Sequence, residues 1–419
     1  MTGLEKAQPA IGRPAAKVEL RRSLSLFLIT FYGLGTILGA GIYVLVGKVA
    51  GVSGMFAPVS FALAAVIAGL SAFTYMELCS RHPLAGGAAV YTQQGFGLRW
   101  LSILVGFLIV LSGLVSAATI SKGFVGYFRV FVELPDVLII VGVVVALALL
   151  AAWGIAQSVA AAAVATVIEV GGLILILVVA SASFATLPER LPELIPPMEL
   201  VAWEGIFLGG FLAFYAFIGF EDMANVAEEV KDPIRNMPRA ILLAIAVSTL
   251  LYIAVSLAAV LALPLDELSA SRAPLALMFE RATGASPKVM ALISLFAVIN
   301  GALIQIIMAA RMLYGMSREG WLPKRIGAVN SRTQTPVLAT VLVSAAVLVL
   351  ALALPLVTLA KITSFAVLAV FALLGLALAR MKRAGPPAPG VYTVPLWVPY
   401  ASTVAAISLL GLQVYDMLR

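Results

Sequence analysis

Charged side chains are scarce in this sequence, and their scarcity excludes most soluble folds. Asp, Glu, Lys and Arg together make up 11% of the 419 residues, whereas 62% of the residues are hydrophobic and the mean hydropathy is +1.09. A soluble domain of this length could not cover its surface with so few charges. The composition therefore predicts a polytopic membrane protein.

Cysteine and histidine each occur once, as Cys79 and His82. A single cysteine excludes a disulfide framework, and the two residues are too few for the clusters that hold metal ions. We therefore expect a protein that has no cofactor and no metal site and that is not an enzyme. The net charge of +7 implies no nucleic-acid partner, because the placement of Lys and Arg in loops explains it.

Hydrophobic runs long enough to cross a bilayer recur along the whole chain. A helix needs about 20 apolar residues to span the ~30 Å hydrocarbon core. The runs do not alternate apolar with polar residues, which excludes a transmembrane barrel. We expect an all-α polytopic membrane protein with eleven transmembrane helices, at residues 24–47, 55–79, 100–128, 134–154, 157–184, 203–227, 239–263, 287–313, 336–354, 357–380 and 395–416.

Basic residues set the predicted orientation in the membrane. Most of the 27 Lys and Arg residues fall in the N-terminal tail or in loops that follow even-numbered spans. Because cytoplasmic loops carry the excess of Lys and Arg, we expect a multi-pass protein of the cell (inner) membrane with a cytoplasmic N-terminus. The basic tail is expected to meet anionic membrane lipid.

Helix-weakening and polar residues fall near the midpoint of four predicted spans. The first span contains GLGTILGAGIYVLVG, although each glycine weakens a helix interior by roughly 1 kcal/mol relative to alanine. The sixth span has its midpoint near Tyr215, just before FIGFED; the fifth carries Glu169, and the eighth carries Asn300. Such residues are costly in lipid, so their common depth indicates a functional site.

The interrupted first and sixth spans each open a group of five helices. Two broken helices at matching positions of two halves are typical of inverted-repeat transporters with a binding site at the membrane midplane. We predict five parts: a cytoplasmic tail at 1–23, a first repeat at 24–185, an extracellular loop at 186–202, a second repeat at 203–383, and an inner loop with a last helix at 384–419.

A break in the first span would create a binding site for a carboxylate. The half-helix beyond the break begins with free N–H groups and a positive dipole end at about Ala40 and Gly41, and Gly39 lets a ligand approach the backbone closely. Unwinding also frees carbonyl oxygens that suit an ammonium group, at Ile37 in the first span and at Tyr215, Ala216 and Ile218 in the sixth. The two sets of groups together match the backbone of an amino acid.

Four stretches, in this order along the chain, resemble a known family. GLGTILGAGIYVLVG (33–47) resembles the first-helix signature of the amino acid–polyamine–organocation transporters, and PLAGGAAVY (83–91) is similar to the segment after their second helix. AFIGFEDMANVAEEVKDPIRNMPRAI (216–241) resembles their sixth helix and following loop, and RMLYGMSREGWLP (311–323) the end of their eighth helix. The resemblance implies a five-plus-five inverted-repeat (LeuT-like) core and secondary transport of amino acids or related amines.

The resemblance also assigns residues by position. It places the family's carboxylate-binding amides at Ala40 and Gly41, and its acid of the sixth helix at Glu221. The carbonyls that bind the amino group fall at Ile37, Tyr215 and Ile218.

VIEVGGL (167–173) is similar to the family's fifth helix and places Glu169 where some proton-coupled members carry a lysine. A buried carboxyl group can also carry a proton, so we expect Glu169 to couple transport to protons rather than to sodium. Completion of a sodium site and pairing with a cationic substrate are the alternatives. For the glycine-rich stretch the alternative is close helix packing, because Gly35 and Gly39 have GxxxG spacing.

Several candidate residues keep two interpretations. Glu221 either takes part in coupling and gating or stabilises the broken backbone of its own helix. Asn300 either contacts the substrate or hydrogen-bonds a neighbouring helix. Phe220 is expected to cover the pocket as part of a gate unless it only packs, and Glu77 is expected to have a structural or gating role.

The predicted function is secondary active transport of an amino acid or amine by alternating access. An exchanger and a carrier of polyamines or cationic amino acids are the alternatives, and a channel or a sodium-coupled symporter is less expected. A channel would need spans with continuous polar faces, whereas these spans are apolar with isolated central breaks. The sequence does not specify which amino acid or amine is carried.

Overall fold

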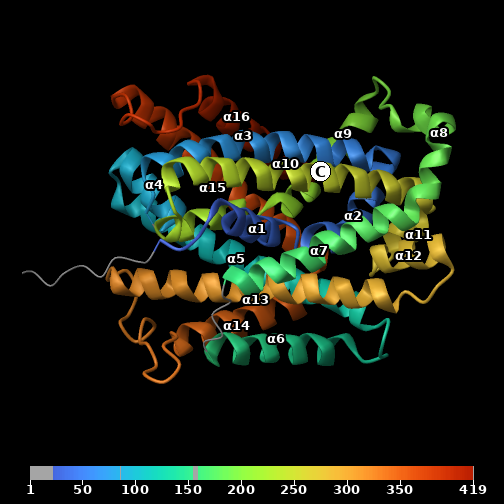
Figure 1. Cartoon of the computed structure of the whole chain (residues 1–419), viewed down its shortest axis with the longest axis horizontal. Helices are drawn as coiled ribbons and strands as arrows, with labels where there is room; N and C mark the ends of the chain where they lie inside the picture. Colours follow the sequence, from blue (N-terminus) through green and yellow to red (C-terminus); the bar gives the residue numbers. More distant parts are fainter. Residues whose placement is uncertain (1–21, 85, 154–158, 419) are drawn as a thin grey trace, which may run out of the picture.

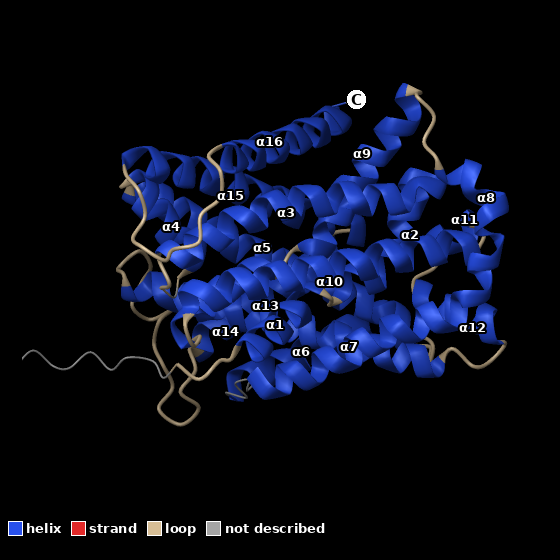
Figure 2. Cartoon of the chain, turned by 45° about the horizontal axis from the view of Figure 1, so that its top comes forward, coloured by secondary structure: helices blue, strands red, loops and turns tan. Residues whose placement is uncertain are grey.

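The computed structural model describes residues 22–84, 86–153 and 159–418, with no account of the side chains of residues 40 and 159–162. Within these ranges the chain is helical, and its only β-pairing is an isolated bridge between Leu24 and Val230. Most helices run along the long axis of the molecule as a bundle (Figures 1 and 2). The predicted lipid-binding tail at 1–23 lies almost entirely outside the described residues.

The helical elements have the following bounds in chain order: α1 (Leu26–Ile37), α2 (Ala40–Ser53), η1 (Gly54–Phe56), α3 (Ala57–Arg81), α4 (Gly87–Phe96), α5 (Arg99–Phe128), α6 (Asp136–Trp153), α7 (Val159–Val179), η2 (Ala180–Thr186), α8 (Leu187–Leu194), α9 (Leu200–Phe214), η3 (Tyr215–Phe217), η4 (Phe220–Glu229), α10 (Pro233–Ala262), α11 (Leu265–Ala270), α12 (Pro274–Thr283), α13 (Lys288–Arg318), α14 (Val337–Ala353), α15 (Leu356–Ala384) and α16 (Trp397–Leu418).

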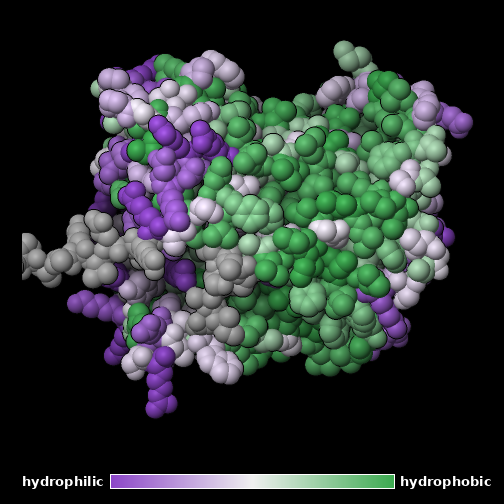
Figure 3. Space-filling model, viewed as in Figure 1, coloured by the Kyte–Doolittle hydropathy of each residue, from purple (hydrophilic) through white to green (hydrophobic). Residues whose placement is uncertain are grey.

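The described chain contains nine helical segments that are long and apolar enough to cross a membrane, and two shorter apolar helices, Leu26–Ile37 and Val337–Ala353. On the face drawn in Figure 3, apolar side chains cover the middle, most hydrophilic side chains gather at the left end of the bundle, and fewer lie at the right end. We name these the α4 end and the α12 end after the helices that lie there (Figure 1). The all-α membrane class is confirmed, whereas eleven crossings and the inverted repeat stay predictions.

Several predicted boundaries differ from the structure. α10 begins at Pro233 rather than at residue 239, and α13 ends at Arg318 rather than at residue 313. The first span was expected to end at residue 47, but α2 continues to Ser53. Gly47 and Gly51 are helical and serve close packing: a Cβ at Gly47 would lie 2.3 Å from the carbonyl oxygen of Leu268, and one at Gly51 would lie 2.9 Å from the Cβ of Ser269. The segment 186–202, predicted to be an extracellular loop, contains the eight-residue helix α8.

The beginning of α1 is tied to the segment that follows η4. The N–H groups of Ser23 and Leu24 both donate to the carbonyl oxygen of Glu229 at 2.9 Å, and the N–H of Lys231 donates to the carbonyl oxygen of Leu24 at 2.9 Å. These backbone bonds join the α4 ends of the two broken helices.

Candidate functional site

The first predicted break is present, and it divides the helix between α1 and α2. Leu38 and Gly39 lie outside both helices, and Gly39 precedes α2 without a side chain that could cap it. The first N–H groups of a helix have no partner inside that helix. The start of α2, from Ala40 to Ile42, therefore presents N–H groups and a positive dipole end at the break.

The second predicted break divides the sixth helix into α9, the turn η3 and the segment η4, with Ile218 and Gly219 outside helical structure. Gly219 has φ +133°, a backbone angle that residues with a side chain rarely adopt. A Cβ on Gly219 would lie 2.3 Å from the carbonyl oxygen of Thr36, at the end of α1. Glycine is thus required here because the two breaks touch each other.

Tyr252 of α10 connects the two breaks by hydrogen bonds to their backbone. Its buried hydroxyl lies 2.7 Å from the carbonyl oxygen of Ile37 and 2.9 Å from that of Ala216. A hydroxyl has one proton, so it donates to only one of these two carbonyl oxygens at a time. Two of the carbonyl groups that we expected to be free therefore have a tyrosine donor, which the sequence interpretation missed.

A cavity lies between the breaks, and we call it the central cavity. Five of the predicted substrate-binding residues line it: Ile37, Gly39, Gly41, Tyr215 and Ile218. Its other walls come from α1, α5 and α13, which contribute Thr36, Ser116, Ile120, Gly301, Ile304 and Gln305. The side chain of Ala40 is outside the described part of the structure, and Ala216 lies behind the wall, where a Cβ on Gly41 would approach its Cα to 2.3 Å. Gly41 is therefore also a packing position.

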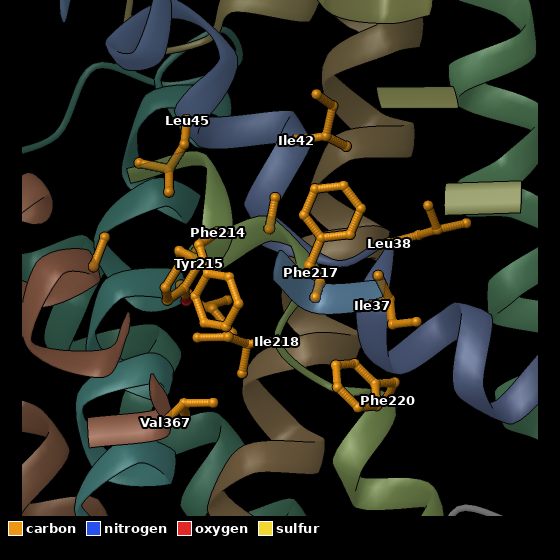
Figure 4. Close-up of a cluster of buried hydrophobic side chains, with 14 of the residues drawn as sticks. Ile37, Leu38, Ile42, Leu45, Phe214, Tyr215, Phe217, Ile218, Phe220 and Val367 are labelled. Carbon is orange, nitrogen blue, oxygen red and sulfur yellow. The ribbon is translucent and has the colours of Figure 1, made fainter. Parts of the chain in front are cut away.

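Apolar side chains and a few polar groups lie close together where the two breaks meet (Figure 4). Figure 4 shows Ile37, Leu38 and Ile42 of the first broken helix beside Phe217 and Ile218 of the second. Within the same region the hydroxyls of Tyr215 and Ser116 lie 3.0 Å apart. A ligand in the central cavity would thus meet backbone polar groups, two hydroxyls and apolar side chains.

Glu169 of α7 lies beside the end of α1 and is 0% exposed. Its Oε1 accepts a hydrogen bond from Nδ2 of Asn300 at 2.9 Å. Its Oε2 has no hydrogen-bond partner among the described residues, and a Cβ on Gly35 would lie 3.8 Å from it. An unsatisfied buried carboxylate oxygen is costly. Asn300 thus contacts Glu169, whereas its neighbour Gly301 lines the central cavity.

Glu221 and Asp222 line a second cavity, which we call the acidic cavity and which shares only Ile218 and Gln305 with the central cavity. Oε2 of Glu221 accepts from the N–H of Gly219 at 2.8 Å, which stabilises the break. Oδ2 of Asp222 accepts from Nε2 of Gln305 at 3.3 Å. The sequence interpretation did not select Asp222 or Gln305 for the site.

Phe220 does not line either cavity. Its ring lies 5.5 Å from that of Tyr75 and 5.3 Å from that of Phe371, measured between centroids, within an aromatic cluster. Of its two interpretations, packing is the one that its position supports.

Comparison with known proteins decides the family. Residues 24–415 match the family model described as amino acid permease. The chain belongs to the amino acid permease family. This confirms the resemblance to the amino acid–polyamine–organocation transporters and shows that the relatives of this permease are transporters.

Individual relatives of the permease differ in what their names say they carry. It is 27% identical over 357 residues to the branched-chain amino acid permease BcaP of Bacillus subtilis, which covers 80% of this chain and 75% of that protein. It is 32% identical over 351 residues to the vacuolar cationic amino acid transporter 2 of Arabidopsis thaliana, over 77% of this chain and 54% of the plant protein. It is 27% identical over 372 residues to the methylthioribose transporter of Bacillus subtilis, over 82% of this chain and 77% of that protein. The permease thus spans about half the length of the plant relative.

Proposed function

We propose that this permease moves an amino acid or a related amine across the cytoplasmic membrane by alternating access, with the substrate bound in the central cavity. The observation that carries the proposal is the meeting of the two broken helices at one cavity. The start of α2 offers N–H groups for the carboxylate, and the carbonyl groups of Ile37, Tyr215 and Ile218 offer acceptors for the ammonium.

Tyr252 has a place in this binding step. The ammonium group of a substrate carries N–H donors that would compete with the Tyr252 hydroxyl for the carbonyl oxygen of Ile37. On binding, the substrate ammonium would therefore replace the Tyr252 hydroxyl as donor to the carbonyl oxygen of Ile37. This carbonyl would then be hydrogen-bonded both with and without substrate.

The moving body would consist of α1, α2, α3, the segments α9 to η4, and α10. The backbone bonds between Leu24 and the segment after η4 support this grouping, as does the contact of Tyr252 with both breaks. We place the α4 end in the cytoplasm, because the basic loops that the sequence predicts to be cytoplasmic lie there.

Proton coupling is assigned to Glu169. Its carboxyl group is fully buried, has one oxygen without a partner in the described ranges, and lies beside α1 just before the break. A proton on that oxygen would make the group neutral while the site is closed. Release of the proton when the site opens would link the proton gradient to the position of the first helix.

Uptake by the purified full chain in proteoliposomes tests the proposal. The probes are radiolabelled L-leucine and L-lysine, with and without a proton gradient directed inward. We expect the gradient to increase the uptake of at least one probe in the wild type and in the control variant Glu193→Gln, whose acid is on exposed α8. Uptake by Glu169→Gln should not respond to the gradient. A wild type indifferent to the gradient would contradict proton coupling, and acceleration only by unlabelled internal amino acid would establish an exchanger.

A further inference from the structure

The acidic cavity adjoins the proposed substrate site and has features of a binding site for a cation. We propose that it receives the positively charged end of the substrate, so that this permease selects amino acids with an unbranched cationic side chain, such as lysine or ornithine. The inference rests on the proposed function, because it takes the central cavity as the site of the amino acid backbone.

The two cavities follow one another along the same helices. On α5 the central cavity is lined by Ser116 and the acidic cavity by Ser112; on α13 the corresponding residues are Ile304 and Met308. Each pair is four residues apart, which corresponds to about 6 Å along a helix. The four-carbon stem of lysine, extended, can carry an ammonium group over such a distance.

The wall between the cavities is formed by residues that both share, Ile218 and Gln305. Gln305 donates to Oδ2 of Asp222 at 3.3 Å, which is a long hydrogen bond. A turn of the Gln305 amide away from Asp222 would free Oδ2 for a ligand, while Oδ1 would remain 3.5 Å from Nδ2 of Asn225. The amide oxygen of Gln305 can then accept a hydrogen bond from the ligand.

The two carboxyl groups of the acidic cavity lie next to each other in the chain and have no cationic partner among the described residues. Neither Glu221 nor Asp222 forms an ion pair with any residue in the ranges 22–84, 86–153 and 159–418, and Asp222 is 8% exposed. Buried charges are normally paired. A cationic ligand would supply the missing partner.

A second observation points to a ligand independently of the acids. Tyr75 of α3 lines the acidic cavity and is 2% exposed, yet its hydroxyl forms no hydrogen bond in the described part of the chain. An ammonium group has three N–H donors. Asp222, the Tyr75 hydroxyl and the hydroxyl oxygen of Ser112 offer three acceptors on this cavity wall.

The remaining lining of the acidic cavity matches an aliphatic stem. Ile109, Met308, Met312 and Val367 contribute apolar surface around the acids. Methionine side chains adapt to ligands of different shape, so lysine, ornithine and arginine are all expected to fit. A neutral branched side chain would fill the same space but would give the acids no cationic partner and the Tyr75 hydroxyl no donor.

Equilibrium binding to the purified full chain tests the inference, with L-lysine and L-norleucine as probes, because norleucine has the stem of lysine without the ammonium group. We expect the wild type to bind lysine about tenfold more tightly than norleucine, or more. Asp222→Asn should weaken lysine binding about tenfold and change norleucine binding less than about twofold. Asp222→Glu should keep the preference for lysine, and the control Asp416→Asn, at the far end of α16, should bind like the wild type.

The failures are distinguishable. Equal or tighter binding of norleucine by the wild type overturns the cationic preference while leaving the proposed transport of amino acids intact. Equal losses for both probes in Asp222→Asn also overturn the inference, because the aspartate would then only support the fold. If the wild type neither binds nor transports any amino acid, the proposed function fails together with the inference. Tyr75→Phe provides the second variant, and we expect it to bind lysine more weakly than the wild type does and to bind norleucine equally well.

Discussion

Two glutamates of this permease are equally inaccessible to solvent but differ in how their oxygens are satisfied. Glu77 and Glu169 are both 0% exposed. Glu77 accepts hydrogen bonds from Arg81, from Lys382 and from the N–H of Val394. Glu169 accepts one from Asn300, and its second oxygen is unsatisfied in the part of the chain that is described.

The difference separates a structural acid from a candidate coupling acid. Glu77 forms ion pairs with Arg81 and Lys382 and joins α3 to α15 and to the segment before α16, so its charge balances two cations at the α4 end. Glu169 has an amide neighbour and no cation within the described ranges that balances it. Burial alone therefore does not distinguish the two carboxyl groups, whereas the unpartnered oxygen of Glu169 beside a helix break is the feature on which the proposed coupling role rests.

The largest expected effect is that of Glu77→Gln on stability. The side chains of Arg81 and Lys382 are only 10% and 13% exposed, so the substitution leaves two nearly buried cations without a counter-charge. We expect a loss of roughly 3–5 kcal/mol in the free energy of unfolding. Thermal unfolding in detergent measures it, and a variant that melts with the wild type would show that this network does not support the fold.

Tyr252→Phe should have the next largest effect. It removes the donor to the carbonyl groups of Ile37 and Ala216, and leaving buried acceptors unsatisfied costs about 1–3 kcal/mol. Because the substrate ammonium is proposed to replace this donor, saturating substrate should raise the melting temperature of the variant more than that of the wild type. Equal substrate-induced shifts in the two proteins would contradict the exchange of donors.

Glu169→Gln should change stability by only about 1 kcal/mol, because its amide oxygen can keep the hydrogen bond from Asn300. Its effect should fall on coupling, so that uptake no longer responds to an inward proton gradient. Comparison with Glu77→Gln sharpens the distinction, since Glu169→Gln should be as stable as described but uncoupled from the proton gradient, whereas Glu77→Gln should be unstable. A Glu169→Gln protein that still responds to the gradient would remove the assignment.

The smallest effect is expected for Lys361→Gln. Lys361 pairs with Asp416 at 3.4 Å, and the two side chains are 31% and 34% exposed. Partly exposed ion pairs contribute about 0–1 kcal/mol. Lys361 and Lys382 both join α15 to a neighbouring acid, so melting curves of Lys361→Gln and Glu77→Gln compare the same kind of pair at two depths. A loss as large as that of Glu77→Gln would show that depth does not matter here.

The sequence predicted the helix breaks because their causes are local. Gly39 in an apolar run, and Gly219 before two acids, indicate positions where a helix cannot continue at low cost. The family resemblance was predictable for the same reason, since its motifs are short and continuous. The extent of α2 was not, because Gly47 and Gly51 serve packing against α11, about 220 residues away along the chain.

The partners of the site residues could not be predicted, because they come from distant parts of the chain. Tyr252 reaches Ile37 across 215 residues, and Lys382 reaches Glu77 across 305. The sequence showed a tyrosine in an apolar span and a lysine at a helix end, and neither feature specifies a partner. The acidic cavity likewise depends on Gln305 and Tyr75, whose proximity to Asp222 follows from the packing of three helices.

The central claim is that the substrate lies between the two breaks, and a structure of the full chain saturated with a transported amino acid tests it most directly. The account predicts that the carboxylate of the substrate lies at the N–H groups that begin α2, and that its ammonium lies at the carbonyl oxygens of Ile37 and Ile218. Ligand density outside the central cavity, with the two breaks still closed by Tyr252, would contradict the account.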